Sequence, residues 1–67
     1  MNYQERFIVQ DLETFEFLFP DIDGGIGQTP YLSLAGKYDY YQDALEAGVE
    51  EIGGEFTIFR FFEAVQP

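Results

Sequence analysis

The chain has 67 residues, with 13 acidic side chains against three basic ones and a formal net charge of −10. This charge repels nucleic acid and anionic lipid and attracts basic surfaces, so it argues against direct binding to either and favours a basic partner. Because 46% of the residues are hydrophobic and 19% are aromatic, the chain has the apolar content of a folded domain, which disordered acidic chains lack.

The length allows one small domain over residues 1–67 and few ways to stabilise it. The chain contains no Cys and no His, which excludes disulfides, thiolate chemistry and the usual zinc sites. No segment has the roughly 20 apolar residues of a membrane span, and residues 1–6 lack the features of a signal peptide. We therefore expect a cytoplasmic domain without cofactors, held together by packed aromatic side chains.

The N-terminal third has the pattern of strands. Residues 6–10 predict one strand, and the three alternating Phe residues within 14–19 predict a second. We expect residues 5–19 to form a hairpin or one long bulged strand. The alternative is a short helix capped at Asp11, because apolar residues also recur there at helical spacing.

The middle of the chain is rich in turn-forming residues. Pro20 is expected to end the preceding element, and residues 21–29, which include three Gly, to form a loop. Residues 31–35, after Pro30, predict a further short strand, and the Gly-Lys pair at 36–37 predicts a turn.

The clearest element is a helix from about Tyr40 to Ile52. Asp39 is placed to cap it, and Gln42 follows at the spacing of a capping box. Apolar and small residues recur on one face, which predicts close packing against a sheet. These residues are Tyr41, Ala44, Leu45, Gly48, Val49 and Ile52. Gly53 and Gly54 predict a left-handed stop.

Residues 55–65 predict the last strand, with apolar side chains on both sides. One side carries Phe56, Ile58, Arg60, Phe62 and Ala64, and the other carries Thr57, Phe59, Phe61, Glu63 and Val65. Such a strand is typical of the centre of a sheet, or of a strand whose second side meets a partner. The predicted fold is therefore α+β, with a small antiparallel sheet of three to four strands, one helix on one face, and the order β-β-(β)-α-β. The last strand is expected to lie beside an N-terminal strand.

Two segments of the loop at 21–29 resemble ligand-binding motifs but lack residues that those motifs require. Asp21-Ile22-Asp23-Gly24 resembles the start of a calcium loop, but Gly25 and Leu32 stand where further oxygen ligands are needed, so a solvated turn is predicted. The Gly run at 24–27 lacks the Lys and Ser/Thr of a phosphate loop. With no His or Cys and little room for a dry cleft, we do not expect an enzyme.

The carboxylates of the predicted helix are the main candidates for function. Asp43, Glu46 and Glu50 lie on its outer face with Glu51 beside them, and the helix contains no Lys or Arg. Glu46 and Glu50 repel each other at i, i+4, and acidic residues in the last turn oppose the helix dipole. We therefore expect this face to meet Lys and Arg of a partner, with mimicry of nucleic-acid phosphates as one form. The alternative is an ordinary solvated face.

Further residues could extend this surface. Tyr38 and Tyr40 flank Asp39 at the helix entrance, and Tyr is enriched at interfaces, although local packing is an equal alternative. A second acidic cluster is formed by Asp11, Glu13, Glu16, Asp21 and Asp23. The candidate partner-binding set is Tyr38, Asp39, Tyr40, Asp43, Glu46, Glu50 and Glu51, with Asp21 and Asp23.

From Tyr38 to Phe62 the chain is similar in layout to small acidic inhibitors encoded by bacteriophages. A strand, an acidic helix with Asp-Ala-Leu-Glu at 43–46, a Gly-containing turn and an amphipathic strand follow one another. The short phage inhibitor of bacterial RNA polymerase and several compact anti-CRISPR proteins have this layout. The resemblance is one of topology and composition.

The resemblance implies a non-enzymatic protein in the host bacterial cytoplasm. It would bind a basic protein or ribonucleoprotein surface and block the access of DNA or RNA. The alternative function is a structural or assembly module, a homodimer that buries the aromatic sheet side of Phe59, Phe61 and Val65.

Overall fold

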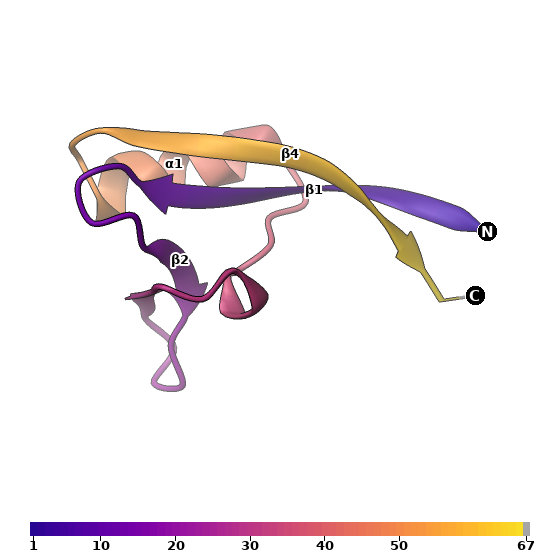
Figure 1. The fold of residues 1–67 in the computed structure, drawn as a ribbon, viewed down its shortest axis with the longest axis horizontal. Coiled ribbons are helices and arrows are strands. Elements are labelled where there is room, and N and C mark those ends of the chain that lie inside the picture. The colour runs from indigo at the N-terminus through magenta and orange to yellow at the C-terminus, as the bar shows by residue number, and fades with distance from the viewer. Residues whose placement is uncertain (67) are drawn as a thin grey trace.

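The computed structural model describes residues 1–66, which form a four-stranded antiparallel sheet with one helix on one face (Figure 1). The strand order is β3-β2-β1-β4, and the helix precedes the last strand. The predicted α+β class is confirmed. In chain order the elements are β1 (Asn2–Asp11), β2 (Phe17–Pro20), β3 (Ile26–Thr29), the 3-10 helix η1 (Leu32–Leu34), α1 (Tyr41–Glu51) and β4 (Phe56–Val65).

Strands β1 and β4 pair antiparallel over their whole length, from Asn2 opposite Val65 to Asp11 opposite Phe56. The last strand therefore lies beside an N-terminal strand, as predicted. The central strand is β1, however, and β4 is an edge strand. Of the two alternatives for the last strand, the central position was wrong, because β2 and the segment at Tyr38 pair with β1 and no element of residues 1–66 pairs with the outer side of β4.

Residues 5–19 form the predicted hairpin, and the alternative short helix is absent there. The connecting turn is held by backbone hydrogen bonds from Asp11 N to Glu16 O (2.8 Å) and from Phe15 N to Asp11 O (2.8 Å). Phe15 has φ 64°, which places it in the left-handed region. The second strand therefore begins at Phe17, later than the alternation of Phe residues predicted.

Two predictions for the middle of the chain were wrong. Residues 26–29 of the expected loop form β3, which pairs with β2 from Phe17 opposite Thr29 to Pro20 opposite Ile26. The strand expected at 31–35 is a 3-10 turn, in which Leu34 N donates to Tyr31 O (3.0 Å). Because β3 already occupies the edge of β2, no strand position is left there for residues 31–35.

The helix begins and ends close to the predicted bounds, but its predicted N-cap was wrong. Tyr40 occupies the cap position and makes no side-chain cap hydrogen bond. The carboxylate of Asp39, one residue earlier, binds the guanidinium of Arg6 and does not cap the helix. At the other end, Gly53 has φ 74° and its N–H donates to Gly48 O (3.0 Å). The left-handed glycine stop is confirmed at Gly53.

The core lies between α1 and the sheet. Phe7 and Val9 of β1, Leu18 of β2 and Ala44 of α1 form its buried centre. The partly buried Tyr38, Ala47, Ile52, Phe56 and Ile58 pack against it. Only the small residues of the helical stripe, Ala44 and Gly48, are buried, whereas Tyr41 and Val49 are more than half exposed. Helix α1 therefore lies close to the sheet, but only along the narrow strip formed by its small residues.

Candidate functional site

Helix α1 presents the candidate carboxylates to solvent. Asp43, Glu46, Glu50 and Glu51 are all exposed, and the last turn of the helix contains no basic residue. Within residues 1–66, the one side-chain hydrogen bond to these groups comes from Gln42 Nε2 to Glu46 Oε1 (3.3 Å). The structure therefore brings all four groups together on one exposed element.

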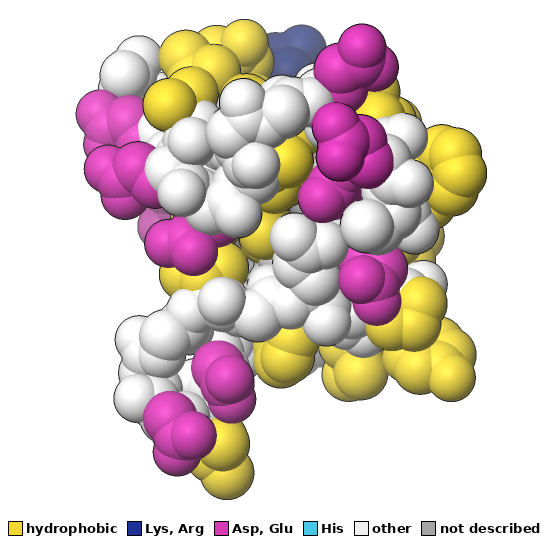
Figure 2. Space-filling view, turned by 90° about the vertical axis from the view of Figure 1, so that its left-hand side faces the viewer, with side chains coloured by type: hydrophobic (Ala, Val, Ile, Leu, Met, Phe, Trp, Pro, Cys, Tyr) yellow, Lys and Arg dark blue, Asp and Glu magenta, His cyan; other side chains and the backbone are white. Residues whose placement is uncertain are grey.

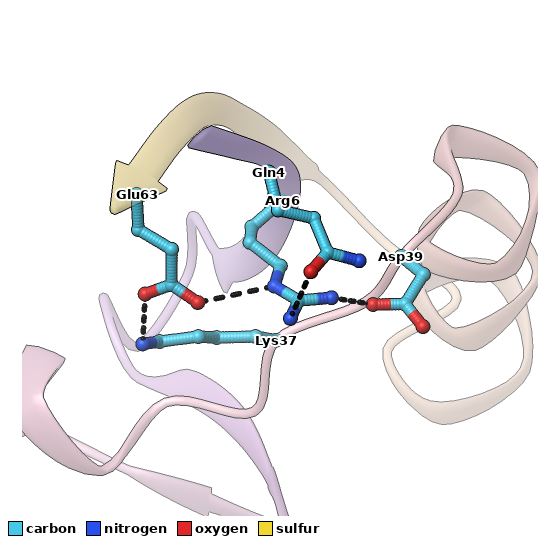
Figure 3. Close-up of polar contacts among 5 residues, drawn as sticks. All are labelled: Gln4, Arg6, Lys37, Asp39 and Glu63. Carbon is cyan, nitrogen blue, oxygen red and sulfur yellow. Dashed lines mark hydrogen bonds and ion pairs between the residues drawn. The ribbon is translucent and has the colours of Figure 1, made fainter. Parts of the chain in front are cut away.

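The basic side chains lie elsewhere and are all paired. Figure 3 shows the pairs made by Arg6 and Lys37. Arg6 Nε lies 3.1 Å from Glu63 Oε1, and Lys37 Nζ lies 2.6 Å from Glu63 Oε2. Arg6 also donates to Asp39, and Arg60 binds Glu5. No ion pair in residues 1–66 reaches a carboxylate of α1, so the charges of the molecule are segregated.

Glu63 is the anchor of the group that we call the Arg6 cluster, namely Gln4, Arg6, Lys37, Asp39 and Glu63 (Figure 3). Hydrogen bonds from Lys37 and then from Arg6 hold the pKa of the Glu63 carboxyl below its ordinary value. The cluster joins β1, β4 and the segment that enters α1. Its charges therefore serve mainly internal contacts.

Tyr38 and Asp39, predicted as part of the binding rim, are both engaged inside the molecule. Tyr38 exchanges two backbone hydrogen bonds with Phe7 (2.8 and 2.9 Å), and its ring packs against the core. Burial, and then the nearby Glu51 carboxylate, raise the pKa of the Tyr38 hydroxyl. Tyr40, by contrast, is 69% exposed at the start of α1. Of the three, Tyr40 is the best placed for an external contact.

The second acidic cluster does not join the first. Asp21 and Asp23 are exposed in the turn between β2 and β3, which extends away from α1 in Figure 1. On the face of the molecule drawn in Figure 2, the acidic side chains (magenta) lie in separate groups. Asp11 is buried and accepts hydrogen bonds from Glu13 N (2.8 Å) and Gln28 Nε2 (3.4 Å), so it stabilises the hairpin turn.

An apolar groove of about 510 Å³ opens on the other face of the sheet. It is lined by Ile8, Gln10, Phe17, Leu32, Ala35, Lys37, Phe59, Arg60 and Phe61. Ile8 and Phe59 are opposite each other in the β1–β4 pair and share this face, because their neighbours Phe7 and Ile58 pack toward α1. The sequence predicted the Phe59 and Phe61 side but not the groove, because a strand was expected where η1 supplies Leu32.

Comparisons with known proteins give no relative for this chain. No family, curated protein or solved structure matches it. Residues 1–66 contain no group of three or more potential metal ligands. In the same residues, no helix has the length and apolar character needed to cross a membrane.

Proposed function

We propose that this protein is a non-enzymatic inhibitor whose helix α1 occupies a basic, nucleic-acid-binding surface of another protein or ribonucleoprotein complex. The observation that carries the proposal is the segregation of charge. Four exposed carboxylates lie on α1 without a cationic partner in residues 1–66, while Arg6, Lys37 and Arg60 are paired with Glu5, Asp39 and Glu63. Such a face has unsatisfied attraction for Lys and Arg.

The spacing of the charges supports mimicry of a single nucleic-acid strand. Asp43 and Glu51 are separated by about 12 Å along the helix axis, at about 1.5 Å per residue. Four negative charges in that length approach the density of one strand of a duplex, about one charge per 3.4 Å. A basic groove shaped for a phosphate backbone could therefore accept α1 in its place.

The proposal also explains an arrangement that weakens the helix. Glu46 and Glu50 repel each other at i, i+4, and Glu50 and Glu51 stand at the negative end of the helix dipole. The like-charge pair costs about 0.2–0.5 kcal/mol in an isolated helix, and an unfavourable charge at the helix end costs about 0.3–1 kcal/mol. A basic partner would remove this cost on binding.

The test compares two double charge reversals. The immobilised protein is used to capture proteins from a bacterial lysate at low salt, and the bound material is then eluted with salt or with excess duplex DNA. We expect Glu46→Lys with Glu50→Lys to abolish capture, and the matched pair Asp21→Lys with Asp23→Lys, in the separate turn, to leave most of it. Capture that survives the helix reversal, or that resists both salt and DNA, would disprove the proposal.

A second candidate function, a self-assembling module, is favoured by the amount of exposed surface. The accessible area is 4800 Å² for a chain of 7.7 kDa, whereas a compact monomer of this mass exposes about 4,300 Å². Phe59 and Phe62 of β4 remain 46% and 56% exposed. Sedimentation equilibrium tests this candidate, because a monomer at all concentrations would eliminate it.

A further inference from the structure

The outer edge of β4 carries a row of unpaired backbone groups. In an antiparallel sheet, the N–H and C=O of one residue point to the same side, and successive residues alternate. Phe7 exchanges both of its hydrogen bonds with Tyr38, so its backbone groups point away from β4. Its partner across the ladder, Arg60, therefore points its N–H and C=O away from β1 and toward the free edge.

The same alternation fixes the rest of the edge. The outward-pointing residues are Phe56, Ile58, Arg60, Phe62 and Ala64. The residues between them point toward β1. Glu55, directly before the strand, follows this alternation, because its O accepts a hydrogen bond from Leu12 N (2.9 Å). Outside that ladder, no hydrogen bond within residues 1–66 reaches the backbone of β4. Figure 1 shows β4 along the outermost border of the sheet.

Little on β4 protects this edge from pairing. Natural edge strands are commonly short or carry Pro, Lys or bulges, and β3 at the other border has four residues, includes Gly27 and is followed by Pro30. By contrast, β4 has ten residues in unbroken register with β1 and contains no Pro or Lys. Its two charged residues are neutralised within the chain, Arg60 by Glu5 and Glu63 by Lys37 and Arg6.

We propose that two copies of this chain join through their β4 edges, antiparallel and about a two-fold axis perpendicular to the sheet, to form one continuous eight-stranded sheet. This inference rests on the second candidate function, self-assembly, and specifies its interface as the strand edge. The two-fold axis preserves the sheet faces, so outward-pointing residues of one copy meet outward-pointing residues of the other.

A second copy of the chain fits the free edge of β4 because that edge is complementary to itself. A pairing centred on Phe61 places Arg60 opposite Phe62 of the other copy and separates the two Arg60 side chains. Arg60 already lies over the ring of Phe62 within one chain, 4.9 Å from its centroid, so a cation–π contact suits both groups. The same pairing would cover the exposed rings of Phe62 and Phe59.

The net charge gives the dimer a characteristic salt dependence. Two bodies of −10 repel each other at long range, while the joined edges are locally neutral. Added salt screens the repulsion, with a screening length of about 8 Å at physiological ionic strength. Dimerisation should therefore strengthen with salt, whereas binding of α1 to a basic partner should weaken. The two proposals can thus fail independently.

The experiment measures association and amide hydrogen exchange on the full chain. We expect sedimentation equilibrium to show a monomer–dimer equilibrium that shifts toward dimer between low and high salt. In the dimer, the amides of Ile58, Arg60 and Phe62 should gain protection with protein concentration, while those of Phe59 and Phe61 stay protected throughout because they bond β1. A monomer at millimolar concentration and high salt, or protection without this alternation, would overturn the inference.

Proline substitution isolates the backbone contribution. Phe62→Pro removes an outward N–H and the ring, and Phe62→Ala removes the ring alone; Pro is tolerated where the N–H faces away from the ladder. We expect Phe62→Pro to weaken the dimer at least about 10-fold relative to Phe62→Ala. Ala64→Pro repeats the test without loss of a ring should Phe62→Pro fail to fold. Equal dimerisation of folded proline and alanine variants would refute edge pairing. As a control, the variant with Glu46→Lys and Glu50→Lys in α1 should dimerise at least as well as the native chain.

Discussion

Gly48 in α1 lies against the ring of Phe56 at the start of β4. A Cβ added to Gly48 would approach Cδ2 and Cζ of that ring to 2.7 Å, far inside normal contact. Ala is favoured over Gly inside a helix by about 1 kcal/mol. We nevertheless expect Gly48→Ala to destabilise the fold by about 1–3 kcal/mol, because the overpacking outweighs the helix propensity. Urea unfolding followed by circular dichroism gives the free energy.

Two variants check the cause of that loss. Val49→Ala changes the neighbouring position, which is 59% exposed, and should stay within about 0.5 kcal/mol of the native chain. Adding Phe56→Leu to Gly48→Ala should recover part of the stability, because the smaller side chain makes room for the methyl group. A Gly48→Ala protein as stable as the native chain would show that α1 does not pack this closely.

Phe15 closes the β1–β2 turn with φ 64° while its ring is 66% exposed. A left-handed backbone costs an L-residue about 1–2 kcal/mol, and glycine adopts it without that cost. We expect Phe15→Gly to be more stable than Phe15→Ala by about 1 kcal/mol, since both remove the ring and only glycine relieves the strain. Thermal unfolding of the pair measures the difference. If alanine is the more stable of the two, the turn does not have this backbone conformation in solution.

The charges of α1 should affect stability in opposite directions at its two ends. Glu50→Lys removes the repulsion with Glu46, creates a Glu-to-Lys pair at i, i+4 and suits the helix dipole. We expect a gain of about 0.5–1 kcal/mol at low salt. Asp43→Lys, in the first turn, loses a favourable dipole interaction and should destabilise. Both effects should shrink in 1 M salt, and two changes of the same sign would contradict the assignment.

The sequence could predict what local pattern and burial determine together. The hairpin at 5–19, the helix and the β1–β4 pairing followed from periodicity and turn residues, and the structure has all of them. The features that the sequence did not predict depend on contacts between distant segments of the chain. Asp39 was a good N-cap locally, but Arg6 comes from a strand far away in the chain and takes its carboxylate. Likewise, β3 pairs through the backbone of a polar, Gly-containing segment that shows no apolar alternation.

The candidate surface was predictable to a similar degree. Helical spacing alone places Asp43, Glu46, Glu50 and Glu51 on one exposed element. The engagement of Tyr38 with Phe7 and the separation of Asp21 and Asp23 from α1 depend on chain topology. An edge position for β4 could not be inferred either, because apolar residues on both sides are also typical of a central strand.

The Arg6 cluster gives the fold a specific response to acid. Lys37 and Arg6 lower the pKa of Glu63 in the folded chain relative to its ordinary value of 4.5. Below that value the unfolded chain binds a proton that the folded chain does not yet bind, so this stabilisation is complete above about pH 4.5 and is lost as the pH falls through the lowered folded pKa. We expect Glu63→Gln to flatten the decline of unfolding free energy in this acid range, measured by urea titration at successive pH values. Asp23→Asn, which removes an exposed carboxylate of the β2–β3 turn, should leave the slope almost unchanged. An equal flattening by both variants would mean that the acid response comes from the overall negative charge, and not from the ion pairs of Glu63.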